Sequence, residues 1–90
     1  MRKYGRRDTN QSDIVRDLRL AGCSVQDLAS LGDGAPDALV GYRGLDRLME
    51  FKTKKGKLTP DQITWHALWR GRKVEVVRST EEALDAMGLK

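Results

Sequence analysis

Apolar residues recur along this chain at two spacings, and each spacing predicts a different kind of element. A spacing of three or four residues is typical of amphipathic helices. It occurs in three stretches, at residues 10–21, 59–71 and 79–88. The second stretch opens with Thr59, Pro60 and Gln62, which match a capping box with proline at the first helical position. Ser79 and Glu82 open the third stretch with a second capping box.

Shorter apolar runs, some of them alternating with polar residues, predict strands. Four such runs lie at residues 23–28, 38–42, 47–53 and 73–78. Turn residues between Gly41 and Gly44 predict that the second and third strands form an antiparallel hairpin. We therefore expect one α/β domain over residues 10–90, in the order helix, three strands, helix, strand, helix. Residues 1–9 carry four basic side chains without periodicity, and we expect a flexible basic tail there.

The predicted hairpin brings chemically active side chains together. Side chains alternate between the faces of a strand, so Glu50 and Lys52 point to one face and Phe51 to the other. Counting back from the turn places Asp37 roughly opposite Glu50. Each fragment alone is also typical of an ordinary strand start or a solvated strand face, but both flank the same hairpin.

A pair of converging carboxylates needs a cation between them. Mg²⁺ is commonly held by one or two carboxylates together with waters and phosphate oxygens. Such a metal lowers the pKa of a bound water and neutralises charge that develops on a phosphate. Lys52 is placed to hold the attacking water or to stabilise the transition state. Asp37, Glu50 and Lys52 together therefore indicate phosphodiester hydrolysis.

The charge balance adds a class of partner. The net charge of +4 and the isoelectric point of about 9.5 favour a polyanion such as nucleic acid. Lys54, Lys55 and Lys57 form a basic cluster that is either a solvated loop or an electrostatic funnel for phosphates. Arg6 and Arg7, in the basic tail, are further candidates for phosphate contacts.

Composition also excludes several classes of protein. Cys23 is the only cysteine, so neither an internal disulfide nor a cysteine-based zinc site is expected. No apolar run approaches the length that spans a membrane, and the basic first residues are not followed by the apolar segment of a secretory signal. We expect a soluble protein in a reducing, cytoplasmic setting, with no membrane partner.

Five further residues each have two interpretations. Asp13, expected in the first turn of the first helix, either supports the helix dipole or supplies a third carboxylate near a metal. Gln62 either completes its capping box or reaches toward the site. His66, the only histidine, is more typical of a helix face than of a catalytic base. Trp65 and Trp69, four residues apart, favour packing in the core over a platform for stacking bases.

The order of these motifs resembles a known superfamily. A helix, then Pro36-Asp37, then Glu50-Phe51-Lys52, then a helix that opens with Gln62 looks like the PD-(D/E)xK nucleases. Within that superfamily the chain is most similar to the VRR-NUC family of small stand-alone nucleases, many of them phage-encoded. The resemblance extends from about Asn10 to Leu84. It implies a restriction-endonuclease-like core of α-β-β-β-α-β order with a C-terminal helix.

The resemblance also implies roles for individual residues. Asp37 and Glu50 would ligate Mg²⁺ or Mn²⁺, and Lys52 would act on the nucleophilic water or the scissile phosphate. Gln62 would lie close to this lysine. Asp13 would correspond to the acidic residue that such nucleases carry on the first helix, although that residue is usually glutamate.

The resemblance further implies a class of substrate and an assembly. Small nucleases of this kind resemble Holliday-junction resolvases, in which a symmetric dimer cuts branched DNA such as four-way junctions. We therefore expect a metal-dependent, structure-selective endodeoxyribonuclease that acts as a homodimer. Two alternatives are a DNA-binding module on a nuclease-like fold that has no turnover, and a nuclease subunit that is active only with a partner.

Overall fold

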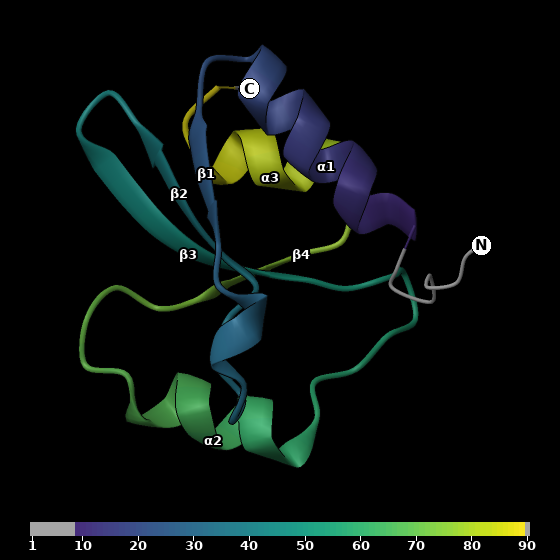
Figure 1. Ribbon diagram of the computed structural model, residues 1–90, viewed down its shortest axis with the longest axis vertical. Helices are drawn as coiled ribbons and strands as arrows, with labels where there is room; N and C mark the ends of the chain where they lie inside the picture. The colour runs from purple at the N-terminus through teal and green to yellow at the C-terminus, as the bar shows by residue number, and fades with distance from the viewer. Residues whose placement is uncertain (1–8, 90) are drawn as a thin grey trace.

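The computed structural model describes residues 9–89, which form a small mixed α/β domain (Figure 1). Its three α-helices and four strands follow the expected order, with one short 3-10 helix in addition. The elements are α1 (Thr9–Leu20), β1 (Ser24–Asp27), η1 (Ala29–Leu31), β2 (Ala38–Tyr42), β3 (Leu45–Phe51), α2 (Pro60–Leu68), β4 (Glu75–Val77) and α3 (Thr80–Ala86). Residues 1–8, to which the expected tail with Arg6 and Arg7 belongs, lie outside the described range.

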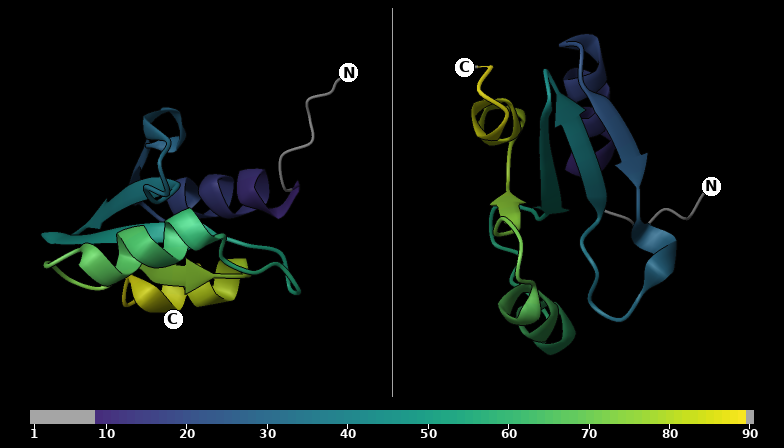
Figure 2. Two further views of the ribbon diagram at one scale, coloured as in Figure 1. Left: turned by 90° about the horizontal axis from the view of Figure 1, so that it is seen from below. Right: turned by 90° about the vertical axis from the view of Figure 1, so that its left-hand side faces the viewer.

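All four strands form one mixed sheet in the order β1-β2-β3-β4, which the right panel of Figure 2 shows across the view. β1 pairs with β2 and β2 with β3, both antiparallel, whereas β4 runs parallel to β3. The parallel pairing follows from the long connection through α2, which returns the chain to the same end of the sheet. This connection also gives α2 its place next to the ends of β2 and β3.

The expected hairpin is confirmed, and its turn sets the register of β2 against β3. Only Arg43 and Gly44 lie between the strands, and both have positive φ, at +50° and +82°. A two-residue turn of this kind matches the twist of the flanking strands. Because the turn is so short, β3 begins at Leu45 and ends at Phe51, two residues earlier than the sequence predicts.

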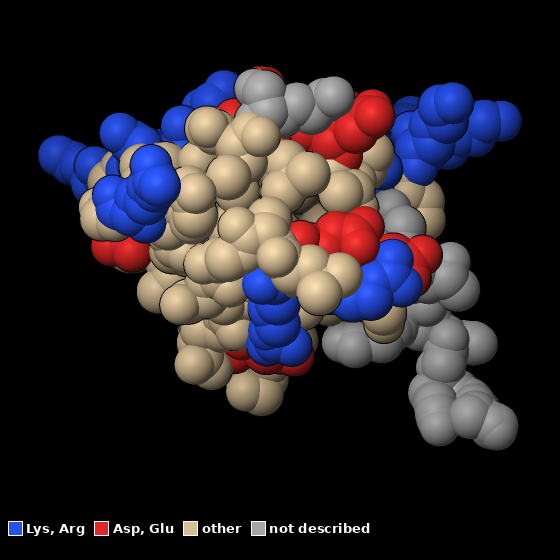
Figure 3. All heavy atoms as spheres, turned by 90° about the horizontal axis from the view of Figure 1, so that it is seen from above, with Lys and Arg blue, Asp and Glu red and all other residues tan. Residues whose placement is uncertain are grey.

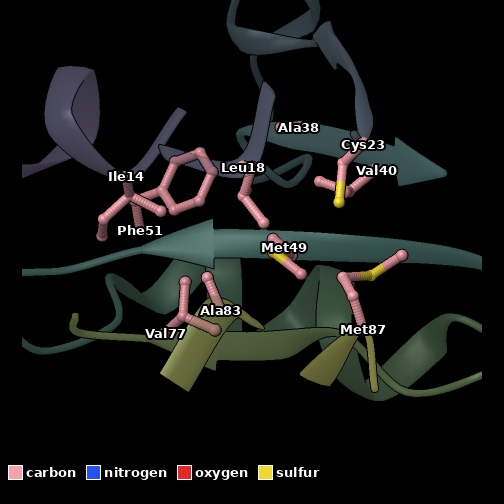
Figure 4. Close-up of a cluster of buried hydrophobic side chains, with 10 residues drawn as sticks. All are labelled: Ile14, Leu18, Cys23, Ala38, Val40, Met49, Phe51, Val77, Ala83 and Met87. Atoms are coloured by element: carbon pink, nitrogen blue, oxygen red, sulfur yellow. The ribbon is translucent and has the colours of Figure 1, made fainter. Parts of the chain in front are cut away.

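The main core lies between the sheet and the two helices α1 and α3, which cover one face (Figures 2 and 4). Every second residue of β2 and β3 points into it, as strand periodicity requires. Its members are fully or almost fully buried: Ile14, Leu18, Cys23, Ala38, Val40, Met49, Phe51, Val77, Ala83 and Met87. The alternate residues, which include Asp37 and Glu50, therefore face the opposite side of the sheet.

Helix α2 lies at the other side of the sheet from this core (Figure 1). Its capping box is confirmed, since the backbone amide of Thr59 donates to the Gln62 side chain at 2.9 Å and the Gln62 amide donates to the Thr59 hydroxyl at 3.2 Å. A Cβ atom added at Gly34, which has φ +85°, would collide with the backbone carbonyl of Asp61. The absence of a side chain at Gly34 therefore lets the loop before β2 pack directly against the first turn of α2.

Two expectations about the helices need correction. α2 ends at Leu68, and Trp69 is 46% exposed, so the predicted core packing of the tryptophan pair is wrong for Trp69. Ser79 caps α3 by accepting from the Glu82 amide, but the Glu82 carboxylate accepts from the amide of Arg78 instead of closing the box on Ser79.

Among residues 9–89, no helix has the length and apolarity needed to cross a membrane.

Candidate metal-dependent active site

The expected pairing of Asp37 with Glu50 is present in the structure. Ala38 pairs with Met49, and the Asp37 amide donates to the Met49 carbonyl at 3.0 Å, so the next residues along, Asp37 and Glu50, lie opposite each other. The Asp37 carboxylate also accepts a hydrogen bond of 2.8 Å from the amide of Phe51. The backbone of β3 therefore fixes the Asp37 side chain over the end of the hairpin.

Glu50 is the only buried charged side chain among the described residues, with 1% of its surface exposed. Two side chains of α2 hold its oxygens. The amide nitrogen of Gln62 donates to Oε2 at 3.0 Å, and Nε2 of His66 lies 3.3 Å from Oε1. Gln62 thus has both of the roles that the sequence left open, since its oxygen caps α2 while its nitrogen binds Glu50.

His66 is the residue whose contribution the sequence interpretation understated. It lies one helical turn after Gln62, and residues four apart share a helix face, so the two side chains reach Glu50 together. That spacing is the signal that could have identified it. Burial, followed by the nearby charge of Lys52, lowers the pKa of His66, while Asp37 acts in the opposite direction. The imidazole is therefore neutral near neutral pH.

The electrostatics of the pair follow from burial. Loss of solvent, then the hydrogen bond and the negative charge of Asp37, raise the pKa of Glu50 from 4.5 to about 8, and the charge of Lys52 partly opposes this. Glu50 therefore retains a proton at neutral pH, next to the Asp37 side chain. A divalent cation would satisfy the same requirement by taking the place of that proton.

Lys52 follows the end of β3, where its backbone amide donates to the Val77 carbonyl at 3.0 Å. Its charge acts on both Glu50 and His66, so the expected convergence of Asp37, Glu50 and Lys52 holds in the structure. These three residues lie at the start of β2 and the end of β3, and α2 supplies the side chains that support Glu50.

The loop after Lys52 carries the predicted basic cluster, and Lys54, Lys55 and Lys57 are all exposed there. Arg78 organises this loop from the end of β4. Its Nη1 donates to the carbonyl oxygens of Thr53 at 2.7 Å and Gly56 at 2.6 Å. Contacts to two carbonyls hold the loop in one conformation, a role for Arg78 that the sequence pattern did not indicate.

Asp13 is not brought to the carboxylate pair. Because α1 begins at Thr9, Asp13 is its fifth residue and lies beyond the first turn, contrary to the expectation. Its side chain is 63% exposed and pairs with Arg16 at 3.2 Å. The α1 residues that line the cavity beside Asp37 include Gln11 and Ser12 but not Asp13. Asp13 therefore occupies another face of the helix.

The donor set fits a hard divalent cation with two protein ligands. Among residues 9–89, no group of three or more His, Cys, Asp and Glu side chains is arranged to hold a metal ion. Mg²⁺ does not require one, because it usually retains several waters and takes one or two carboxylates together with substrate phosphate. Asp37 and Glu50 would provide those carboxylates, and the proton that Glu50 retains marks the place where a positive charge is needed.

Seen from the side of α1 and α3, the surface is largely uncharged over the helices, with basic side chains at both margins and further basic and acidic side chains between them (Figure 3). Comparisons of the chain with models of protein families, with curated proteins and with solved structures find no match.

Proposed function

We propose that this protein is a metal-dependent endodeoxyribonuclease of the PD-(D/E)xK superfamily, similar to its VRR-NUC family. The observation that carries the proposal is the buried Glu50, which lies opposite Asp37 with the charge of Lys52 beside it. A buried carboxylate is costly for a fold of this size, so a structural role alone explains it poorly. Its placement next to an exposed lysine loop favours a phosphate-containing substrate.

Each residue of the site has a role in phosphodiester hydrolysis. Asp37 and Glu50 would hold Mg²⁺ or Mn²⁺, which supplies the Lewis acidity that activates water and neutralises charge on the phosphate. Lys52 contributes a positive charge on the same side, where it orients the attacking water or the scissile phosphate. Gln62 and His66 fix the Glu50 carboxylate, so that its oxygens are already oriented when substrate arrives.

The exposed lysines would bind the DNA backbone on either side of the cut. Lys54, Lys55 and Lys57 belong to a loop that begins directly after the catalytic lysine, and Arg78 holds this loop by its carbonyls. Phosphate contacts of this kind position the DNA without reading its sequence. Selection of a substrate would therefore depend on the shape of the DNA.

A small domain with one site suits a symmetric assembly. A four-way junction presents two equivalent strands, and a homodimer with two-fold symmetry presents two equivalent sites. We therefore extend the proposal to paired cleavage of branched DNA by a homodimer. Paired cuts on opposite strands would support this extension, whereas single unpaired cuts would limit the proposal to a monomeric nuclease.

The test is cleavage of labelled four-way junction, flap and linear duplex DNA in the presence of Mg²⁺, Mn²⁺ or EDTA. Wild-type protein is compared with Glu50→Ala and Asp37→Ala. Asp85→Ala is the matched control, because Asp85 is an exposed acid of α3, on the other side of the sheet from Asp37 and Glu50. We expect metal-dependent cleavage by the wild type and the control, and none by the two site variants, while all four proteins bind DNA.

Two other outcomes would redirect the proposal. DNA binding without cleavage under every metal would favour a DNA-binding module without turnover. Cleavage that appears only after addition of a partner protein would favour a subunit of a larger nuclease. Equal metal-dependent cleavage by wild type, Glu50→Ala and Asp37→Ala would contradict the assignment of the site itself.

A further inference from the structure

The face of the sheet that carries Asp37 and Glu50 also carries an apolar groove that these catalytic roles leave unused. It has a volume of about 480 Å³, within the usual range for small-molecule sites. Leu39 and Leu48 form its floor, the two tryptophans of α2 and its C-cap form one wall, and Leu31 of η1 lies on the other side. Leu31 is 62% exposed and Trp69 46%, so large apolar groups at this groove face solvent.

The groove begins next to the carboxylate pair. Leu39 and Leu48 are directly opposite each other in the hairpin, two residues from Asp37 and Glu50 on the same face. Two residues along a strand span about 7 Å, which is close to the reach from a phosphate through its sugar to the attached base. A nucleotide with its phosphate at the acids can therefore place its base over the leucines.

We propose that this groove binds the base of a nucleotide next to the scissile phosphate, an inference that rests on the proposed nuclease function. Trp65 and Trp69 stack on each other, with ring centroids 4.9 Å apart and an interplanar angle of 14°. The pair makes a rigid, flat-sided wall, and such aromatic walls favour planar heterocycles of any sequence. Asp46 and Arg72, which also line the groove, provide an acceptor and donors for polar groups of the base.

Charge favours a nucleotide over a second copy of this chain as the occupant. Three exposed cations, Arg70, Arg72 and Lys73, follow α2 at the end of the groove remote from Lys52. They complement the phosphates that continue from a bound nucleotide. In a two-fold dimer that buried the groove, this segment would instead face the partner's groove, whose lining offers only Asp46 as an opposite charge.

The groove also specifies the class of DNA. A base inside a duplex is stacked and paired, so it must first unstack and unpair, at a cost in free energy, before it can enter the groove. That energy is smallest for nucleotides at a branch, in a flap or in a single strand. The site therefore selects DNA with unpaired nucleotides beside the cut, without any sequence-specific contact.

Fluorescence gives a direct test, because Trp65 and Trp69 are the only tryptophans of the chain. The probes are an oligonucleotide of ten thymidines and one of ten abasic residues, which carry the same phosphates, both added in EDTA to prevent cleavage. We expect the thymidine probe to quench tryptophan emission and to bind at least about fivefold more tightly, the smaller end of base–aromatic stacking. Equal affinities with unchanged emission would overturn the inference.

Two matched substitutions locate the effect. Leu39→Gln makes the floor of the groove polar, whereas Leu68→Gln changes an exposed leucine of α2 that does not line the groove. We expect the first to remove the preference for thymidines over abasic residues and the second to retain it. A groove that holds a second copy would instead show loss of the dimer in Leu39→Gln by size-exclusion chromatography, with no discrimination between probes at any stage.

The cleavage assay separates the two levels of the proposal. If the wild type cuts branched DNA with metal but does not distinguish the two probes, only the groove inference fails. If the protein neither cuts nor binds any DNA, the nuclease function fails as well.

Discussion

The buried Glu50 predicts a specific dependence of stability on pH. Its pKa is about 8 in the folded chain and near 4.5 when unfolded, so the folded state retains a proton that the unfolded state loses between these values. Stability from this group is therefore fully present below pH 4.5 and is lost as the pH rises through 8. The slope approaches about 1.4 kcal/mol per pH unit, and the whole window corresponds to roughly 3 to 5 kcal/mol.

Glu50→Gln isolates this effect, because glutamine keeps the shape of the protonated carboxylic acid without its titration. The lowered pKa of His66 makes stability fall as the pH drops below 6.5, which is the opposite of the effect of Glu50. The raised pKa of Cys23 changes stability only near and above pH 9. Among the groups of residues 9–89 whose pKa is shifted, Glu50 therefore makes the largest contribution to the change of stability between pH 6.5 and 8. We expect the wild type to lose stability there, while Glu50→Gln stays nearly constant.

Urea unfolding followed by circular dichroism at pH 6.5, 7.2 and 8.0 measures the difference. Asp46→Asn, an exposed acid on the same strand, serves as the control and should follow the wild type. Addition of Mg²⁺ at pH 8 should stabilise the wild type and leave Glu50→Gln almost unchanged, because a ligand stabilises only the state that binds it. Parallel curves for wild type and Glu50→Gln across this interval would refute the retention of a proton on Glu50.

Three further predictions concern the residues around the site. Gly34→Ala should destabilise the fold by at least about 2 kcal/mol in urea unfolding, because the new Cβ meets the backbone of α2, whereas Gly88→Ala, with positive φ but open space, should cost about 1 kcal/mol. Arg78→Ala should weaken DNA binding in an anisotropy titration and reduce its salt dependence, with Arg78→Lys intermediate; unchanged binding would contradict a loop-ordering role. His66→Ala should lower kcat about tenfold or more without changing DNA affinity, and an altered affinity with full kcat would argue against its role in orienting Glu50.

The sequence predicted the elements of this fold well, because each carries a local signal. The hairpin, its strand alternation and the capping box at Thr59 all depend on residues near one another in the chain, and all are present. The opposition of Asp37 and Glu50 followed from counting across a short turn. Strand boundaries shifted by two residues at β3, since the pattern alone did not show that the turn contains only Arg43 and Gly44.

Features that depend on tertiary packing were not predictable in the same way. Whether Asp13 faces the carboxylates is determined by the rotation of α1 against the sheet, which the apolar stripe fixes only coarsely. The contact of His66 with Glu50 required knowledge that α2 lies over the end of the hairpin. The groove beside Trp65 exists because α2 stands off the sheet, and no local pattern reports such a separation.

The length of the turn at Arg43 and Gly44 sets which side chains of β2 and β3 meet at the far end of the hairpin. Asp37 lies six residues before Arg43, or about 20 Å along the strand. Insertion of one residue in the turn would slide β3 by one position and exchange its faces, sending Glu50 toward the helices and Phe51 toward the solvent side. An insertion or deletion at the tip of this hairpin would therefore separate Asp37 from Glu50 without altering either residue. Natural variation in the length of the turn should be as restricted as variation in the two acids.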